Sequence, residues 1–278
     1  MSNNNGNLKY KTHIILVLFS IAMLFPVIWW VGATFKTIGE MSSANLFPTA
    51  PTLQNYIKGW NLSKAFTFTH FFKNNLIMEV LNVFGSVISS SLVAFGFARV
   101  NFKFKSFWFS ILMLTLMLPS QVTVVSQYIM YSKLHFTDSY FPLIFPHFLG
   151  GGAFFIFLLI QFIRAIPKEL DEAATIDGAS TFGIYWRVIL PLIVPALVTV
   201  GIFTFIWSWD DFYSQVLYIS SISKFTVGLA LRMFIDQFEV QWGQLLAISL
   251  LSILPSVILF FSAQKQFVEG IATTGIKG

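Results

Sequence analysis

The sequence contains no cysteine, and only 10% of its 278 residues carry a charge. Without thiols the chain forms no disulfide, no cysteine-ligated zinc site and no thiol-based active site. Soluble domains carry about 25% Asp, Glu, Lys and Arg, so the scarcity of charge excludes an ordinary water-exposed surface. Because 56% of the residues are hydrophobic and 33 are phenylalanine, the composition predicts helices packed in lipid.

Motifs for binding phosphate, metal or nucleic acid are also missing. The phosphate-loop pattern G-x-x-x-x-G-K-[ST] does not occur. Four scattered histidines, His13, His70, His135 and His147, lack metal-ligand spacing. The net charge of +5 does not indicate nucleic acid, because Lys and Arg in membrane chains mark helix ends and anionic lipid. We expect no metal, no cofactor and no enzymatic activity in this chain.

Six uncharged runs are long enough to cross a membrane, which takes about 20 mostly apolar residues. They cover residues 12–35, 80–98, 106–132, 139–163, 188–209 and 240–264. An even number of spans puts both termini on one side. More than half of the Lys and Arg fall in the segments of that side, which marks it as cytoplasmic. We predict an all-α, polytopic membrane protein with about six transmembrane helices, a cytoplasmic N-terminus (1–12) and a transmembrane domain (13–278).

The segments on the other side differ in length. Residues 36–74 and 210–239 are too long for simple turns, so we expect local structure in the first and a short helix over 227–238 in the second.

A polar segment, residues 163–191, separates the fourth and fifth predicted spans. Pro167 suits the first position of a helix, because its missing N–H would be unpaired there. Glu169, Asp171 and Glu172 would oppose the positive end of that helix. Gly178 is a good helix stop. The segment therefore predicts a short helix that ends at a glycine.

A second helix is expected after the glycine. Ser180 or Thr181 can cap it, and Pro191 and Pro195 remove two helical donors, which should bend the start of the fifth span. The residues leave two interpretations open: a plain cytoplasmic connector, or a surface that docks a partner.

The same segment resembles the EAA loop of permease subunits in binding-protein-dependent ABC importers. That loop reads E-A-A, three residues, G, nine residues, I-x-L-P. This chain has Glu172-Ala173-Ala174, then Gly178, then Val188, Leu190 and Pro191, and Val188 in place of isoleucine is the one departure. The resemblance implies a type I ABC importer permease fold in a bacterial cytoplasmic membrane, with residues 163–191 as the coupling loop.

What the resemblance implies for mechanism is that the coupling loop sits in a groove of a cytoplasmic ATPase subunit. ATP-driven closure of two ATPases, which would bind the ATP and Mg, would switch the spans between inward-open and outward-open. Glu172 would make the main polar contact, Ala173 and Ala174 would permit close approach, and Gly178 would make the turn. The implied coupling residues are Glu172, Ala173, Ala174, Asp177, Gly178, Ala179, Leu190 and Pro191.

The resemblance covers nearly the whole chain and narrows to the carbohydrate-importer branch, the subunit similar to the maltose system's second permease. Four further features carry it: Ala98-Arg99, Leu118-Pro119, Trp209-Asp210-Asp211-Phe212, and the ending Gln264-Lys265 … Gly275-Ile276-Lys277-Gly278. Asp210 stands where the family more often has asparagine.

The implied partners are a second homologous permease, two ABC ATPase subunits and an extracytoplasmic solute-binding protein. The implied substrate is an oligosaccharide, with polyols or glycerol phosphates as alternatives within the family. The rival from another class is a self-contained ion-coupled transporter or a membrane enzyme. Such proteins need paired charges deep in their spans or a catalytic set, and this sequence has neither.

Some polar residues in or near the spans have two interpretations each. Glu79 is either an intramembrane functional acid or, being about one turn from the outer end of its predicted span, a side chain that snorkels to water. Gln121, Thr123 and Gln127 follow Pro119 and either line a sugar pathway or form hydrogen bonds between helices.

Two more features stay open in the same way. Gly150-Gly151-Gly152 permits either close helix approach or local unwinding. Asp210 and Asp211 would cap the outer end of the fifth span and face either water or the binding protein.

Overall fold

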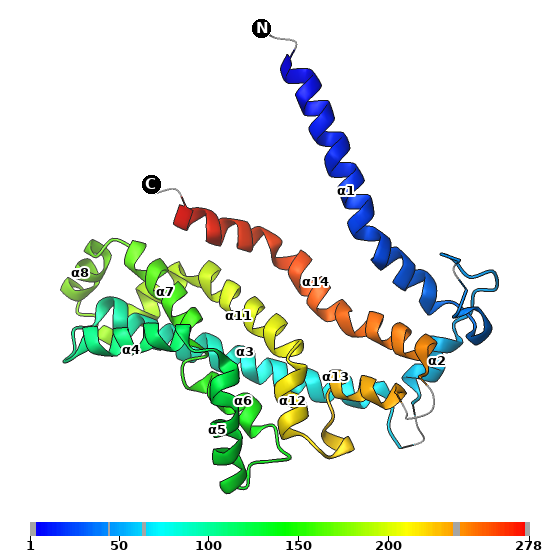
Figure 1. The fold of residues 1–278 in the computed structure, drawn as a ribbon. Coiled ribbons are helices and arrows are strands. Elements are labelled where there is room, and N and C mark those ends of the chain that lie inside the picture. Colours follow the sequence, from blue (N-terminus) through cyan, green and yellow to red (C-terminus); the bar gives the residue numbers. More distant parts are fainter. Residues whose placement is uncertain (1–3, 44, 63–64, 236–239, 276–278) are drawn as a thin grey trace. The chain divides into compact units, whose positions relative to one another are not determined.

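The computed structural model describes residues 4–43, 45–62, 65–235 and 240–275, and the described residues form helices without a named strand (Figure 1). The α-helices are α1 Asn4–Thr34, α2 Gln54–Trp60, α3 Phe68–Arg99, α4 Lys105–Met117, α5 Ser120–Lys133, α6 Phe141–Phe148, α7 Ala153–Ala165, α8 Glu169–Ile176, α9 Thr181–Ile184, α10 Leu190–Leu192, α11 Val194–Trp209, α12 Phe212–Tyr218, α13 Val227–Leu231 and α14 Trp242–Gly275. Short 3-10 turns occupy Ile38–Glu40, Ile222–Lys224 and Arg232–Phe234, and Tyr185–Ile189 is a π-helix.

The chain divides into two compact units: residues 1–70 with 230–254, and residues 71–229 with 255–278. In the first unit, α2 is tied to the end of α1. Asn55 Nδ2 donates to the carbonyls of Thr34 and Lys36, both at 2.8 Å. Phe68 stacks on Phe234 with ring centroids 5.6 Å apart. The predicted local structure between the first two spans is therefore confirmed.

The second unit has one hydrophobic core, built by α3, α7, the π-helix and α11. Its fully or nearly buried members are Ala94, Phe95, Phe155, Ile156, Leu159, Ile160, Ile163, Tyr185, Ile189, Ile193, Ala196 and Val200. Tyr185 also places its hydroxyl 2.8 Å from that of Ser91, so the π-helix is fixed to α3 by packing and by a hydrogen bond.

Four helices among the described residues are long and apolar enough to cross a membrane, or six if each of two bent helix pairs is one span. The prediction of about six spans is confirmed in that sense. The third predicted span, residues 106–132, is not one straight helix, because α4 and the part of α5 from Gln121 onward are inclined at 103°. Pro119 lacks an N–H and pushes Leu118 into an extended conformation (φ −81°, ψ 120°), which ends α4.

The fourth span is interrupted by the three glycines between α6 and α7. All three have positive φ, 115°, 65° and 118° from Gly150 to Gly152, so the backbone is locally unwound. A Cβ on Gly151 would lie 2.8 Å from Ser86 Cα, so close approach applies as well. Both interpretations of this motif are correct.

One predicted boundary was wrong. The second span was expected to begin at residue 80, but α3 already begins at Phe68, because the uncharged run starts later than the helix that contains it. The short outer helix expected over 227–238 is α13 with the 3-10 turn that ends at Phe234; residues 236–239 lie outside the described residues, as do the final three of the Gly275–Gly278 ending.

Candidate functional site

The coupling loop folds as a helix–glycine–helix unit. Helix α8 begins at Glu169, with Lys168 as its N-cap residue. Pro167 was predicted at the first helical position and instead lies two residues before it. Three acids, Glu169, Asp171 and Glu172, occupy the first turn, where they oppose the positive end of the helix dipole.

Helix α8 ends in the two hydrogen bonds of a Schellman motif. The Gly178 N–H donates to the Thr175 carbonyl at 3.0 Å, and the Ala179 N–H donates to the Ala174 carbonyl at 2.9 Å. Gly178 has a φ of +83°, which glycine adopts without strain. The predicted helix stop is confirmed, and the motif gives the alanines at 174 and 179 a role, because they meet across the turn.

The second half of the unit is capped and then bent. Ser180 Oγ accepts from the Gly183 N–H at 3.2 Å, so Ser180 rather than Thr181 is the cap. The helices Thr181–Leu192 and Val194–Trp209 meet at 76°. Pro191 and Pro195 supply no N–H to this stretch, and the π-helix precedes it, which accounts for the bend. The predicted kink is confirmed.

A long-range ion pair attaches α8 to α3. Arg99 Nε lies 2.7 Å from Asp171 Oδ2, and these side chains are only 7% and 18% exposed. Arg99 also donates from Nη2 to the Ile166 carbonyl at 2.7 Å. The base of the coupling loop is therefore held to the end of a long helix.

The outward face of α8 carries a charge and an aliphatic tip. Glu172 and Ala173 are exposed, and Ile176 is 86% exposed. Glu172 takes part in neither of the two ion pairs found among the described residues. Because α8 has no buried residue, this face is open to contact by a partner.

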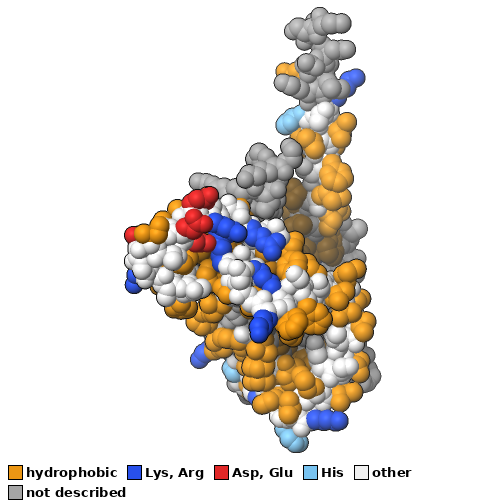
Figure 2. Space-filling model, turned by 90° about the vertical axis from the view of Figure 1, so that its left-hand side faces the viewer, with side chains coloured by type: hydrophobic (Ala, Val, Ile, Leu, Met, Phe, Trp, Pro, Cys, Tyr) orange, Lys and Arg blue, Asp and Glu red, His pale blue; other side chains and the backbone are white. Residues whose placement is uncertain are grey.

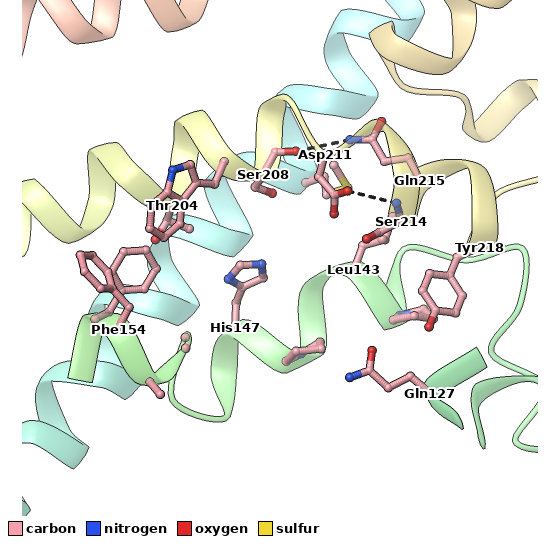
Figure 3. A pocket seen from close by; sticks show the side chains of 18 of the residues that line it. Gln127, Leu143, His147, Phe154, Thr204, Ser208, Asp211, Ser214, Gln215 and Tyr218 are labelled. Atoms are coloured by element: carbon pink, nitrogen blue, oxygen red, sulfur yellow. Dashed lines mark hydrogen bonds between the residues drawn. The ribbon is translucent and has the colours of Figure 1, made fainter. Parts of the chain in front are cut away.

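A cavity of about 590 Å³ lies in the second unit, within the range of about 300–1,000 Å³ typical of small-molecule sites. Figure 3 shows Phe154 at one end and Tyr218 with Gln127 at the other, and His147, Ser208 and Asp211 between them. The lining side chains come from seven helices: α3, α4, α5, α6, α7, α11 and α12. The middle is thus polar and both ends are aromatic.

The end of the cavity at Phe154 is a packed aromatic cluster around Trp207, whose side chain is half exposed. Trp207 stacks on Phe155 with centroids 5.3 Å apart, and Phe154 and Phe203 meet it at 5.6 and 5.2 Å. Sugar rings bind to such faces because their C–H surfaces are apolar while their rims carry hydroxyls.

A second cavity of about 690 Å³ shares Gln127, Asp211 and Ser214 with the first and adds Gln121 and Thr123. The structure therefore brings three of the four predicted pathway residues together with one of the two predicted contacts of a binding protein. Asp211 is the N-cap of α12, where its Oδ1 accepts from the Ser214 N–H at 3.0 Å. Asp210 is exposed and ends α11.

Glu79 is the fourth predicted pathway residue, and of its two interpretations the one in which it snorkels to water is wrong. The side chain is 0% exposed, because α3 begins eleven residues earlier than Glu79 and buries it against α11. Ser208 donates to Glu79 Oε1 at 3.1 Å and accepts from Asn82 Nδ2. Glu79 does not line the two polar cavities; it borders an apolar groove of about 390 Å³, and it reaches the cavity only through Ser208.

Sequence reasoning missed Arg99 as a partner of the coupling loop, and it missed His147 and Trp207 in the cavity. His147 places Nδ1 2.7 Å from Ser86 Oγ, and its carbonyl accepts from Ser89 at 2.7 Å. The one local signal for this site was the glycine triplet, which lets α6 approach α3.

These features define a class: a multi-pass membrane protein with a capped helical elbow at one end of a bent span and a polar cavity between its helices. Residues 86–272 match the family described as binding-protein-dependent transport system inner membrane component. The chain belongs to this family, whose members are transport permeases and not enzymes.

Relatives and a solved structure agree along nearly the full length. The probable ABC transporter permease YurM of Bacillus subtilis is 34% identical over 95% of this chain and 87% of that protein. The probable starch degradation products transport system permease AmyC of Thermoanaerobacterium thermosulfurigenes is 31% identical over 97% of both. A chain of a bacterial ABC transporter that imports the polysaccharide alginate superposes with a TM-score of 0.82 at 20% identity, over 95% of this chain and 98% of that one. The predicted type I importer permease fold is confirmed.

Proposed function

We propose that this chain is a permease subunit of an ATP-driven, binding-protein-dependent ABC importer that moves an oligosaccharide across the bacterial cytoplasmic membrane by alternating access. Its partners are a second homologous permease, two cytoplasmic ATPase subunits that bind ATP and Mg, and an extracytoplasmic binding protein. Both termini are cytoplasmic. The family's description supports the binding protein, and the names of AmyC and of the alginate transporter support a carbohydrate.

The observation that carries this function is the geometry of the coupling loop. Helix α8 is exposed, closed by two hydrogen bonds and joined to α3 by the ion pair between Arg99 and Asp171. A short helix fixed in this way can pass a push from an ATPase to the spans as a rigid body, whereas a flexible loop would absorb the push.

Two substitutions in the coupling loop test this function. Glu172→Ala removes the exposed carboxylate, and Gly178→Pro forces a φ of about −65° where the structure has +83°. We expect both variants to assemble in the membrane and to lose sugar uptake while ATP hydrolysis continues. Gly39→Ala is the control, since a Cβ at Gly39 meets nothing within 4 Å. Normal uptake in both coupling variants would refute the proposal.

The two cavities support the substrate class. An oligosaccharide needs aromatic faces for its rings and amide, carboxylate and imidazole groups for its hydroxyls, and the lining offers Trp207, Gln127, Asp211 and His147. These residues would line the translocation path together with Gln121 and Thr123. A polyol or glycerol phosphate, the alternative substrate, has no ring to stack and would gain little from Trp207.

Trp207→Ala therefore separates the substrate classes. If the substrate is an oligosaccharide, the variant loses a stacking interaction worth about 0.5–1.5 kcal/mol, and the ATPase activity stimulated by the sugar should fall severalfold. Trp29→Ala on α1 is the control and should leave this activity unchanged. If the Trp207 variant and the wild type have equal activity with every sugar tested, the cavity does not belong to the translocation path.

A further inference from the structure

At the start of the coupling loop lies a group of cations that form no ion pair within the described residues. The linkers that follow α3 and α7 meet there, because Arg99 donates to the Ile166 carbonyl. Within the first linker, Lys105 Nζ donates to the Val100 carbonyl at 2.9 Å. The cations Lys105, Arg164 and Lys168 stand at this junction, on α4, on α7 and just before α8. Figure 2 shows Lys and Arg side chains gathered on this face next to a group of acids. We call Lys105, Arg164 and Lys168 the basic cluster.

No member of the basic cluster forms an ion pair within the described part of the chain. The charges of Arg164 and Lys168 both act unfavourably on the charged form of Lys105. Of the three acids in the first turn of α8, Asp171 is paired with Arg99, while Glu169 and Glu172 point to no member of the cluster closely enough to form an ion pair. Like charges held together from three segments are stabilised when an anion joins them.

The surroundings of the basic cluster indicate which anion. Phe104 precedes α4 in the left-handed conformation (φ 61°) and is 76% exposed. Phe107 and Trp108 follow on α4 and are also exposed, and α4 has no buried residue. Arg164 lies over the Phe109 ring at 5.6 Å. Cations next to exposed aromatic rings are typical of the membrane–water interface, whereas an acidic protein surface would leave the phenylalanines in water.

We propose that the basic cluster binds the phosphate of an anionic phospholipid of the inner leaflet, with the acyl chains packed on Phe104, Phe107 and Trp108. The proposal rests on the proposed function in one respect, the cytoplasmic placement of this end. Because Arg99 connects the same junction to α8, the bound lipid neutralises charge at the base of the coupling loop and steadies it. The lipid composition of the membrane thereby regulates how firmly the ATPase is coupled.

The test counts lipids on the intact importer by native mass spectrometry, after purification in nanodiscs of phosphatidylcholine with and without phosphatidylglycerol. The variant is Lys105→Gln with Lys168→Gln; Arg164 is kept because it packs on Phe109. The matched control is Lys73→Gln with Lys133→Gln, two exposed lysines in the second turn of α3 and the last turn of α5. At about 1 kcal/mol per cation, the cluster variant should hold phosphatidylglycerol about 30-fold more weakly than the control.

Three results would overturn the proposal: equal retention of phosphatidylglycerol by the cluster and control variants, equal retention of the neutral and anionic lipids, or displacement of the lipid by free inorganic phosphate. Crosslinks from residue 168 to an acidic ATPase surface in place of lipid would overturn it too. The count uses neither ATP nor sugar. A chain that binds phosphatidylglycerol but drives no uptake therefore refutes the proposed function alone, and a working importer without the lipid refutes this inference alone.

Discussion

Replacing Gly178 by alanine changes only the backbone preference of the coupling loop. A Cβ at this position meets nothing within 4 Å, and φ is +83°. The cost is therefore that of an L-residue in the left-handed region, about 1–2 kcal/mol. It falls on the turn that forms the two capping hydrogen bonds of α8. A penalty of this size lowers the population of the closed turn about 5–30-fold.

The assay is sugar uptake per ATP hydrolysed by the importer in proteoliposomes. We expect Gly178→Ala to lower this ratio severalfold and Gly178→Asn to lower it less, because asparagine tolerates the left-handed region. Gly183→Ala is the matched control, since its Cβ would lie 3.4 Å from Ser180 Oγ, an ordinary contact in a helix. Equal ratios for the alanine and asparagine variants at position 178 would show that the turn is not what transmits the push.

Three shorter predictions follow. Arg99→Gln leaves Asp171 without its ion-pair partner and should destabilise the attachment of α8 to α3 by about 1–3 kcal/mol. Hydrogen exchange of the α8 amides should therefore be faster than in wild type, and an unchanged rate would show that the ion pair does not hold α8. Asp138 accepts a hydrogen bond from the Ser221 hydroxyl at 2.6 Å, which holds the pKa of Asp138 below its usual range. The ionised Asp138 carboxylate contributes to stability above its unfolded pKa of about 4, and this contribution is lost as the pH falls below that value. The Tm of the wild type should therefore drop below pH about 4, and the Tm of Asp138→Asn should change less. Since the chain has no cysteine, a short thiol crosslink between cysteines placed at 82 and 208 should leave uptake intact if α3 and α11 move together.

Local backbone chemistry in the coupling loop was predictable from the sequence. A glycine flanked by helix formers ends a helix through its own φ, and a serine caps the next helix through its own hydroxyl, so Gly178 and Ser180 took their predicted roles. The start was less well determined. Pro167 lies two residues outside α8, because proline is acceptable both at the first helical position and just before the cap.

Tertiary contacts limited the rest of the prediction. Glu79 was placed near water because the uncharged run begins at residue 80, yet α3 extends to Phe68 and buries the carboxylate under α11. The pairing of Arg99 with Asp171 spans 72 positions and no local pattern encodes it. Gln127 and Asp211 were predicted separately, for a pathway and for a docking surface, and only the folded chain shows that they line the same cavity.

The bend before α11 connects the coupling loop to the cavity mechanically. Trp207 lies 13 residues beyond Val194 on α11, or about 20 Å along the axis at about 1.5 Å per residue. A tilt of about 10° at the bend would displace Trp207 by about 3–4 Å over that length, enough to break the stacking on a sugar ring that we propose for it. Ser208 is held between Glu79 and Asn82 of α3. Separating α3 from α11 would break the hydrogen bond from Ser208 to the buried carboxylate of Glu79. The tilt therefore costs least when α3 moves together with α11. The last residue of α3, Arg99, holds the first turn of α8 through its ion pair with Asp171, so a movement of α8 reaches α11 through α3 as well as through the bend.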